Sequence, residues 1–196
     1  MVAIVARLGV ASVAAYGIAT KATYVATMAF YAIRQAAAIH TATRLGAGHD
    51  TERAAIGRQA VLTGGAIGLA AALTLPATAP YLMAAFGAGP VVAAQAAEFL
   101  RCLAGYLVLL ACYIALGGVF QGSGGSPALA RVTVVGTAVQ LPFAYALSGL
   151  GLAGIALALT LSAGLQCAAV LGLFVCRCHQ LSSRSLAGSG ASVPSS

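Results

Sequence analysis

The chain has 196 residues, of which 61% are hydrophobic and only 7% charged, and its mean hydropathy is +0.97. Soluble domains carry about 25% charged residues, so the composition excludes an ordinary soluble domain and predicts packed helices embedded in a lipid bilayer. The net charge of +7 comes from ten Lys and Arg residues that form no basic stripe, so we expect no nucleic-acid partner.

The first predicted transmembrane helix covers residues 10–43. Because about 20 residues suffice to cross a bilayer, this helix should tilt or project beyond the membrane. The sequence Leu-Gly-Ala-Gly at 45–48 is typical of a helix C-terminus. Asp50 or Thr51 is then available as the N-cap of the next helix. This turn therefore separates the first predicted helix from the second.

The second and third predicted helices cover residues 59–76 and 101–121. Pro76 and Pro80 break the apolar stretch between them, which predicts a short outer loop with a half-buried helix around residues 81–86. Glycines spaced four residues apart occur in both predicted helices and favour close packing against neighbouring helices. These pairs are Gly64 with Gly68 and Gly118 with Gly122.

The last two predicted helices cover residues 132–147 and 152–176, and no charged residue occurs between 132 and 176. As one helix this stretch would be about twice as long as the hydrocarbon core of a bilayer is thick. Ser-Gly-Leu-Gly at 148–151 therefore predicts a turn, and Pro142 predicts a kink in the first of the two helices. Because this hairpin carries no charge, we expect it to serve mainly as scaffold.

Most of the arginines fall on one predicted side of the membrane, which the positive-inside rule places in the cytoplasm. Residues 1–180 are thus predicted to form one transmembrane bundle, with a disordered cytoplasmic tail at 181–196. We expect the C-terminus inside, residue 1 outside, and the plasma (inner) membrane as the location. The predicted cytoplasmic arginines are Arg44, Arg53, Arg58, Arg131, Arg177 and Arg184, whereas Arg7 and Arg101 lie on the opposite side.

Lys21 and Arg34 are charged residues inside the first predicted helix. A charge near the middle of a span costs roughly 3 kcal/mol, so each either faces a water-filled cavity or snorkels to an interface. Tyr24, Tyr31 and Gln35 follow spacings of seven and four and therefore share one helix face. Such groups either line a cavity or make ordinary interhelical hydrogen bonds. The candidate residues for a substrate pathway are Lys21, Tyr24, Arg34, Gln35, Tyr113 and Gln121.

Catalytic chemistry finds little support in the sequence. The carboxylates of the chain are Asp50, Glu52 and Glu98, and their positions near membrane edges leave no pair for acid–base work. The Cys-Arg-Cys-His sequence at 176–179 lacks a fourth ligand, so we predict no metal site; palmitoylation or an inert thiol pair are the other interpretations. We therefore expect neither an enzyme nor a bound cofactor.

Several short motifs follow one another in a specific order. They are Val-Ala-Ala-Tyr-Gly-Ile-Ala at 13–19, Leu-Gly-Ala-Gly at 45–48 with a charged cluster at 49–55, Phe-Gln-Gly-Ser-Gly-Gly-Ser-Pro at 120–127, Leu-Pro-Phe-Ala-Tyr at 141–145 and Gly-Leu-Gly-Leu-Ala-Gly at 149–154. In order and spacing over residues 8–178, they resemble helices eight to twelve of the multidrug and toxic compound extrusion (MATE) family.

The resemblance implies an all-α transmembrane bundle of about five spans, equivalent to part of the C-terminal lobe of a two-lobed transporter, with the N-terminal lobe as a missing partner. It implies a fragment of an antiporter that exports drugs or other organic compounds by alternating access, with Na⁺ or H⁺ as the coupling ion. Gly125 stands where the family has Asp, and the coupling carboxylates of the family have no match in these helices. The alternatives are a lipid-linked oligosaccharide flippase of the same superfamily and a non-transporting membrane partner or degenerate fragment.

Overall fold

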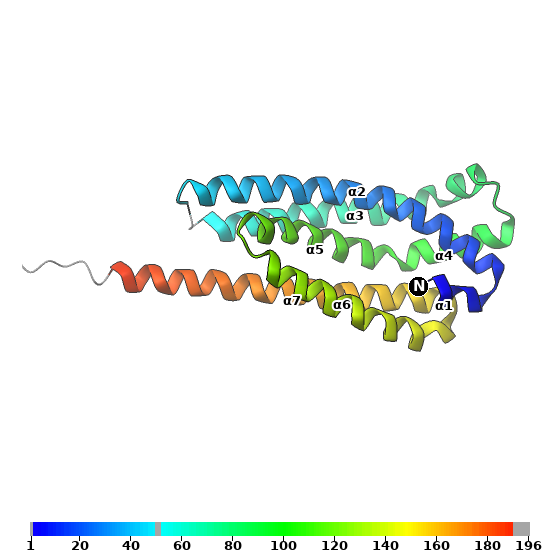
Figure 1. Cartoon of the computed structure of the whole chain (residues 1–196). Coiled ribbons are helices and arrows are strands. Elements are labelled where there is room, and N and C mark those ends of the chain that lie inside the picture. The colour runs from blue at the N-terminus through cyan, green and yellow to red at the C-terminus, as the bar shows by residue number, and fades with distance from the viewer. Residues whose placement is uncertain (1, 50–51, 190–196) are drawn as a thin grey trace, which may run out of the picture.

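The structure, a computed structural model, describes residues 2–49 and 52–189. Over these residues it contains helices and turns and no strand, which confirms the predicted all-α class. The elements in chain order are α1 (Val2–Val5), η1 (Ala6–Leu8), α2 (Val10–Gly46), α3 (Arg53–Ala85), α4 (Pro90–Cys102), α5 (Ala104–Gly122), α6 (Ser126–Leu147), η3 (Ser148–Leu150) and α7 (Gly151–Ser189) (Figure 1).

Helix α5 lies at the centre of the bundle and packs against α2, α3 and α7. Helix α6 packs mainly against α7 and contacts α5 only sparsely. Figure 1 accordingly shows α2, α3 and α5 as one group, with the α6–α7 hairpin running along it as a second group. This division leaves space between α6 and the pair formed by α2 and α5, where the candidate site lies.

Glycine allows the chain to turn at the end of α2. Gly48 has a φ of 80°, its amide donates to the Leu45 carbonyl, and the next amide, of His49, donates to the Arg44 carbonyl at 3.0 Å. This Schellman arrangement satisfies the last carbonyls of the helix and confirms the predicted helix end. Across the turn, Arg44 forms a salt bridge of 3.6 Å with Glu52. The predicted N-caps, Asp50 and Thr51, lie outside the described residues.

Helix α3 does not end at Pro76, as the sequence predicted, but continues through Pro76 and Pro80 to Ala85. A proline inside a helix removes one hydrogen bond and costs about 3 kcal/mol in water, but membrane helices tolerate it when neighbouring helices hold the segment. Here Ala79, between the two prolines, and Met83, beyond them, are fully buried against α2 and α4. The packing of these two side chains therefore outweighs the cost of the prolines, and the helix continues.

The predicted outer loop is shorter than expected, because the half-buried helical segment expected around residues 81–86 is the end of α3 itself. The turn between helices is limited to residues 86–89, and α4 begins at Pro90, where a proline fits the first turn of a helix. Only Leu103 separates α4 from α5, and its backbone is itself helical (φ −80°, ψ −7°). The third predicted helix, 101–121, thus corresponds to α5, and α4 precedes it in an almost continuous run of helix.

Helix α7 extends to Ser189, well beyond residue 181, where the sequence predicted a disordered tail. No glycine or proline occurs between Gly172 and Gly188 to end the helix. Residues 190–196 of that predicted tail lie outside the described residues. Pro142 lies inside α6, which continues to Leu147.

Within the described residues, three segments are long and apolar enough to cross a membrane: Arg53–Ala85, Ala104–Gly122 and Ser126–Cys176. The third contains α6, η3 and the first part of α7, which Figure 1 shows as a hairpin. Helix α2 is not among them, because Lys21, Arg34 and several polar side chains lower its hydropathy. The five predicted spans, and α2 as one of them, therefore stay a prediction.

The two glycine pairs lie where neighbouring helices approach closely. A Cβ atom at Gly64 or Gly68 of α3 would lie 2.8 Å from Ala115 or Ala111 of α5. A Cβ atom at Gly118 or Gly122 of α5 would collide with the backbone of α2, at Arg34 or Ala38. Such approaches confirm the packing role that the sequence predicted for these glycines. They also set the position of Arg34 beside α5.

Candidate functional site

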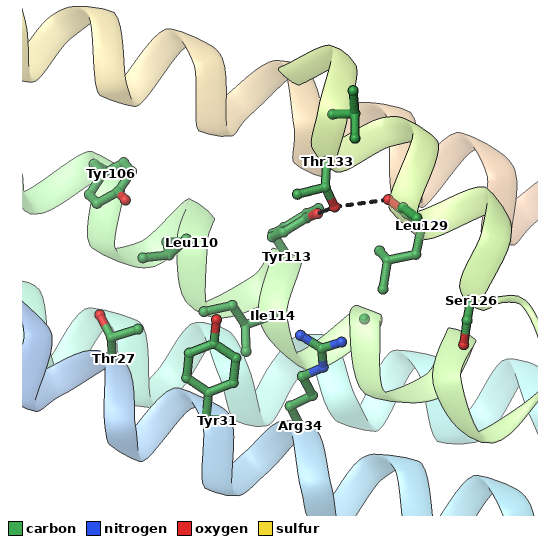
Figure 2. A pocket seen from close by; sticks show the side chains of 13 residues that line it. Thr27, Tyr31, Arg34, Tyr106, Leu110, Tyr113, Ile114, Ser126, Leu129 and Thr133 are labelled. Atoms are coloured by element: carbon green, nitrogen blue, oxygen red, sulfur yellow. Dashed lines mark hydrogen bonds between the residues drawn. The ribbon is translucent and has the colours of Figure 1, made fainter. Parts of the chain in front are cut away.

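A cavity of about 600 Å³ lies between α2, α5 and α6 (Figure 2). This volume falls within the range of pockets that hold drug-sized molecules. Its lining mixes hydroxyl, aromatic and aliphatic side chains with one guanidinium. The lining residues are Thr27, Tyr31, Arg34, Tyr106, Leu110, Tyr113, Ile114, Gly117, Ser126, Leu129, Ala130, Thr133 and Val134.

Each wall of the cavity is a stripe along one helix. On α2, Thr27, Tyr31 and Arg34 are separated by four and then three residues, so they share one face. The stripes on the other helices follow the same spacing: Tyr106, Leu110, Tyr113 and Gly117 on α5, and Ser126, Ala130 and Thr133 on α6. The helical repeat therefore builds the site from three nearly straight rows.

Arg34 is half-buried at one end of the cavity. Its Nε donates a hydrogen bond of 3.3 Å to Oε1 of Gln121, and its Cζ lies 5.8 Å from the centre of the Tyr31 ring. Gly117 faces the guanidinium: a Cβ atom there would lie 3.9 Å from Cζ. Among the lining residues that the structure describes, Arg34 is the only charged one.

A hydrogen bond of 2.6 Å between Tyr113 Oη and Thr133 Oγ1 links α5 to α6 across the cavity wall (Figure 2). Because the Thr133 hydroxyl donates its single proton to the Leu129 carbonyl at 2.9 Å, Tyr113 is the donor in this pair. This hydrogen bond holds α5 and α6 together at a point where the two helices otherwise make few contacts.

Behind this bond lies a second cavity of about 190 Å³, between α5, α6 and α7. It shares Tyr106, Leu110, Tyr113 and Thr133 with the first cavity, and its further lining residues are Thr137, Gln140, Leu159, Ser162, Ala163 and Gln166. The uncharged hairpin therefore forms walls of both cavities. Uncharged hydroxyl and amide groups can still form hydrogen bonds in a cavity. The expectation that the hairpin serves mainly as scaffold stays a prediction.

The structure brings together three of the six predicted site residues. Arg34 and Tyr113 line the large cavity, and Gln121 contacts Arg34. Lys21, Tyr24 and Gln35 are exposed on α2 and are not part of the lining. Tyr24 lies about two helical turns from Tyr31, so sharing a face with it does not bring it to the cavity.

Sequence reasoning passed over several lining residues. Tyr31 shares the polar face predicted for the first helix but is not among the candidate residues, and the candidates also omit Tyr106, Thr27, Ser126 and Thr133. The repeated spacing of four and three, which these hydroxyl groups share with Arg34 and Tyr113, is the signal that would have found them.

Comparison with known proteins decides the family. The MatE family model matches residues 1–146, a range that includes almost all of the helices lining the cavity. The chain belongs to the MatE family. This confirms the resemblance found in the sequence motifs, and because MatE proteins are membrane transporters, this MatE chain is an integral membrane protein of a transporter family rather than of an enzyme family. No curated protein and no solved structure matches it.

Proposed function

We propose that this MatE chain binds an organic compound in the cavity between α2, α5 and α6 and takes part in exporting it by alternating access. The observation that carries the proposal is the cavity itself: a space of about 600 Å³, lined by three tyrosines and one arginine, inside a bundle of membrane-type helices. A largely apolar site with a few polar groups is typical of small-molecule binding.

The packing supports movement of one wall against the others. Helix α6 contacts α5 only sparsely, and the bond between Tyr113 and Thr133 is a polar tie between these two helices inside the cavity. In our proposal, the α6–α7 hairpin shifts against α2 and α5 as the cavity changes its access, while a second lobe completes the binding space from the open side.

Coupling to Na⁺ or H⁺ is part of the proposal. Within the described residues, no carboxylate lines the cavity: Glu52 pairs with Arg44, and Glu98 is exposed on α4. We therefore propose that the coupling cation binds outside this cavity, on the second lobe. We also propose that the C-terminus faces the cytoplasm of a plasma-membrane protein, which the arginines near the α2–α3 and α5–α6 turns support.

An efflux experiment tests the proposal. The chain is expressed in a drug-sensitive host, alone and with a MatE N-terminal lobe, and growth is measured against a panel of organic compounds. We expect protection by the wild-type chain and its loss with Gly117→Leu, because the new side chain fills the cavity. Gly17→Leu is the matched control, since nothing lies within 4 Å of that position.

A green fluorescent protein fused to the C-terminus reports expression and, because it fluoresces only on the cytoplasmic side, orientation. Equal sensitivity of empty, wild-type and variant cells in every arm would remove the proposed export function. Membrane-inserted protein without fluorescence would overturn the proposed orientation.

A further inference from the structure

The charge of the large cavity is unbalanced. Arg34 is its one charged lining residue among those the structure describes, and no Asp or Glu contributes to its wall. The nearest chemical partners of the guanidinium, Gln121 and the Tyr31 ring, are both neutral. An arginine cation inside a membrane protein is costly unless it is paired or hydrated.

Most of the hydrogen-bonding capacity of Arg34 is unused. A guanidinium has five N–H donors, and the bond to Gln121 takes the one on Nε. For the terminal nitrogens Nη1 and Nη2, no hydrogen bond or ion pair occurs among the described residues. With Nε held by Gln121, the terminal edge remains available for two parallel hydrogen bonds, the geometry in which arginine binds a carboxylate.

Other features of the same end of the cavity favour an anion. Ser126, a lining residue, is the first residue of α6, and the first turn of that helix contains no acidic residue. The positive end of the α6 dipole therefore adds to the potential near Arg34. Tyr31 lies beside Arg34 and carries a phenol group that can donate a further hydrogen bond (Figure 2).

The rest of the cavity suits an aromatic or aliphatic body. Tyr106 and Tyr113 line it along α5, and Leu110, Ile114 and Leu129 fill the space between polar groups. From Gly117, beside Arg34, to Tyr106 the α5 wall extends about 16 Å at 1.5 Å per residue. The site is thus elongated, with a cationic end and an aromatic length.

We infer that the transported compound is an amphipathic organic anion, an aromatic carboxylate whose acid group binds Arg34 and whose ring lies between the α5 and α6 walls. This inference rests on the proposed function, because it assigns a substrate class to the proposed transport cavity. It distinguishes this site from one for cationic drugs, which would require a carboxylate or an uncharged aromatic cage in place of Arg34.

Three probes that share one naphthalene ring test the inference by binding: 1-naphthylacetate, the neutral 1-naphthylacetamide and the cation 1-naphthylmethylammonium. Each is titrated calorimetrically into the full chain in lipid nanodiscs, with empty nanodiscs as the correction for partition into lipid. We expect the anion to bind at least about tenfold more tightly than the amide or the cation, as a charge-assisted bond predicts.

Variants locate the effect. Arg34→Gln should weaken binding of the anion at least about tenfold and leave the amide unchanged, whereas Arg34→Lys, which keeps the charge but loses the fork, should weaken it less. Arg101→Gln is the control, since it removes the same charge from an exposed position on α4 outside the cavity. Size-exclusion and thermal-unfolding profiles confirm that each variant is folded.

The inference is overturned if the cation or the amide binds as tightly as the anion, if Arg34→Gln behaves like Arg101→Gln, or if the folded wild-type chain does not bind the anion. Failure of the efflux experiment with anion selectivity intact would remove the transport function and leave the substrate class of the site standing. If the chain protects cells in the efflux experiment but binds the anion with no preference, the transport function stands and the proposed substrate class is removed.

Discussion

Arg34 depends on two residues of α5 for its position. Gly118 allows the α2 backbone at Arg34 to approach α5, and Gln121, one turn further along, accepts a hydrogen bond from Nε. Because Gln121 is neutral, it orients the guanidinium without cancelling its charge. Among the described lining residues the charge therefore comes from Arg34, and at Gln121 only a substitution that adds a carboxylate should cancel it.

Replacing Gln121 separates orientation from charge. Gln121→Leu removes one hydrogen bond, so we expect binding of 1-naphthylacetate to weaken only about two- to fivefold. Gln121→Glu places a carboxylate where Oε1 now lies, 3.3 Å from Nε, so the ion pair should neutralise the cavity and weaken binding at least about tenfold. Calorimetric titration of both variants tests this, with 1-naphthylacetamide as the neutral control. Indistinguishable affinities of the two variants would contradict it.

The residue pattern predicted this site in part. Arg34, Tyr113 and Gln121 were predictable because a charged, aromatic or amide residue inside an apolar helix needs a polar environment. Lys21, Tyr24 and Gln35 satisfy the same criterion but lie outside the lining. Periodicity along α2 gives the shared face, but it does not give the point along the axis at which α6 diverges and the cavity begins. The packing of α2, α5 and α6 against one another determines that point.

At the scale of the helices, α5 acts as the common surface on which the bundle is assembled. It presents a run of buried residues from Ile114 to Phe120 to its neighbours. Helices α3 and α2 both approach it through small residues, α3 at Ala111 and Ala115 and α2 at Gly118 and Gly122. Lipid provides no hydrophobic drive for helix association, so close van der Waals contact at these glycines holds the helices together. The contact between α2 and α5 is therefore expected to be sensitive to one added methyl group.

Gly118→Ala tests this contact. The added Cβ would collide with the Arg34 carbonyl, so the two helices must separate, and we expect destabilisation of about 1–3 kcal/mol. Gly17→Ala, on the exposed part of α2 with nothing within 4 Å, should be neutral or slightly stabilising. Comparing the melting temperatures of both variants with that of the wild type in the same detergent tests this prediction. If the two variants have the same melting temperature, close packing at Gly118 does not hold α2 against α5.

The presence of the helices was easier to predict from the sequence than the positions of their ends. The turn at Gly48 follows from local chemistry, because only a few residues act on it and glycine supplies the positive φ. The continuation of α3 through Pro76 and Pro80 does not, because burial of Ala79 and Met83 against other helices decides it. Local propensity thus located the ends that are made by turns and missed those that depend on tertiary packing.

For the whole molecule, the important division is between the group of α2, α3 and α5 and the hairpin of α6 and α7 (Figure 1). The large cavity lies where these two parts diverge, and the family match extends across its walls. We propose that this space is filled with water in the membrane, since a transport site must exchange with the aqueous phase.

Neighbouring valines on α6 test this claim at one membrane depth. Val134 and Val135 are both exposed, at 69% and 59%, but Val134 lines the large cavity whereas Val135 lies in the groove between α6 and α7. In a chain without its native cysteines, Val134→Cys and Val135→Cys are treated in membranes with a charged methanethiosulfonate. A thiol reacts as the thiolate, which forms in water and not in lipid, so we predict labelling of Val134→Cys at least about tenfold faster. Equal rates at the two positions would show that the large cavity is no more accessible to water than the groove between α6 and α7.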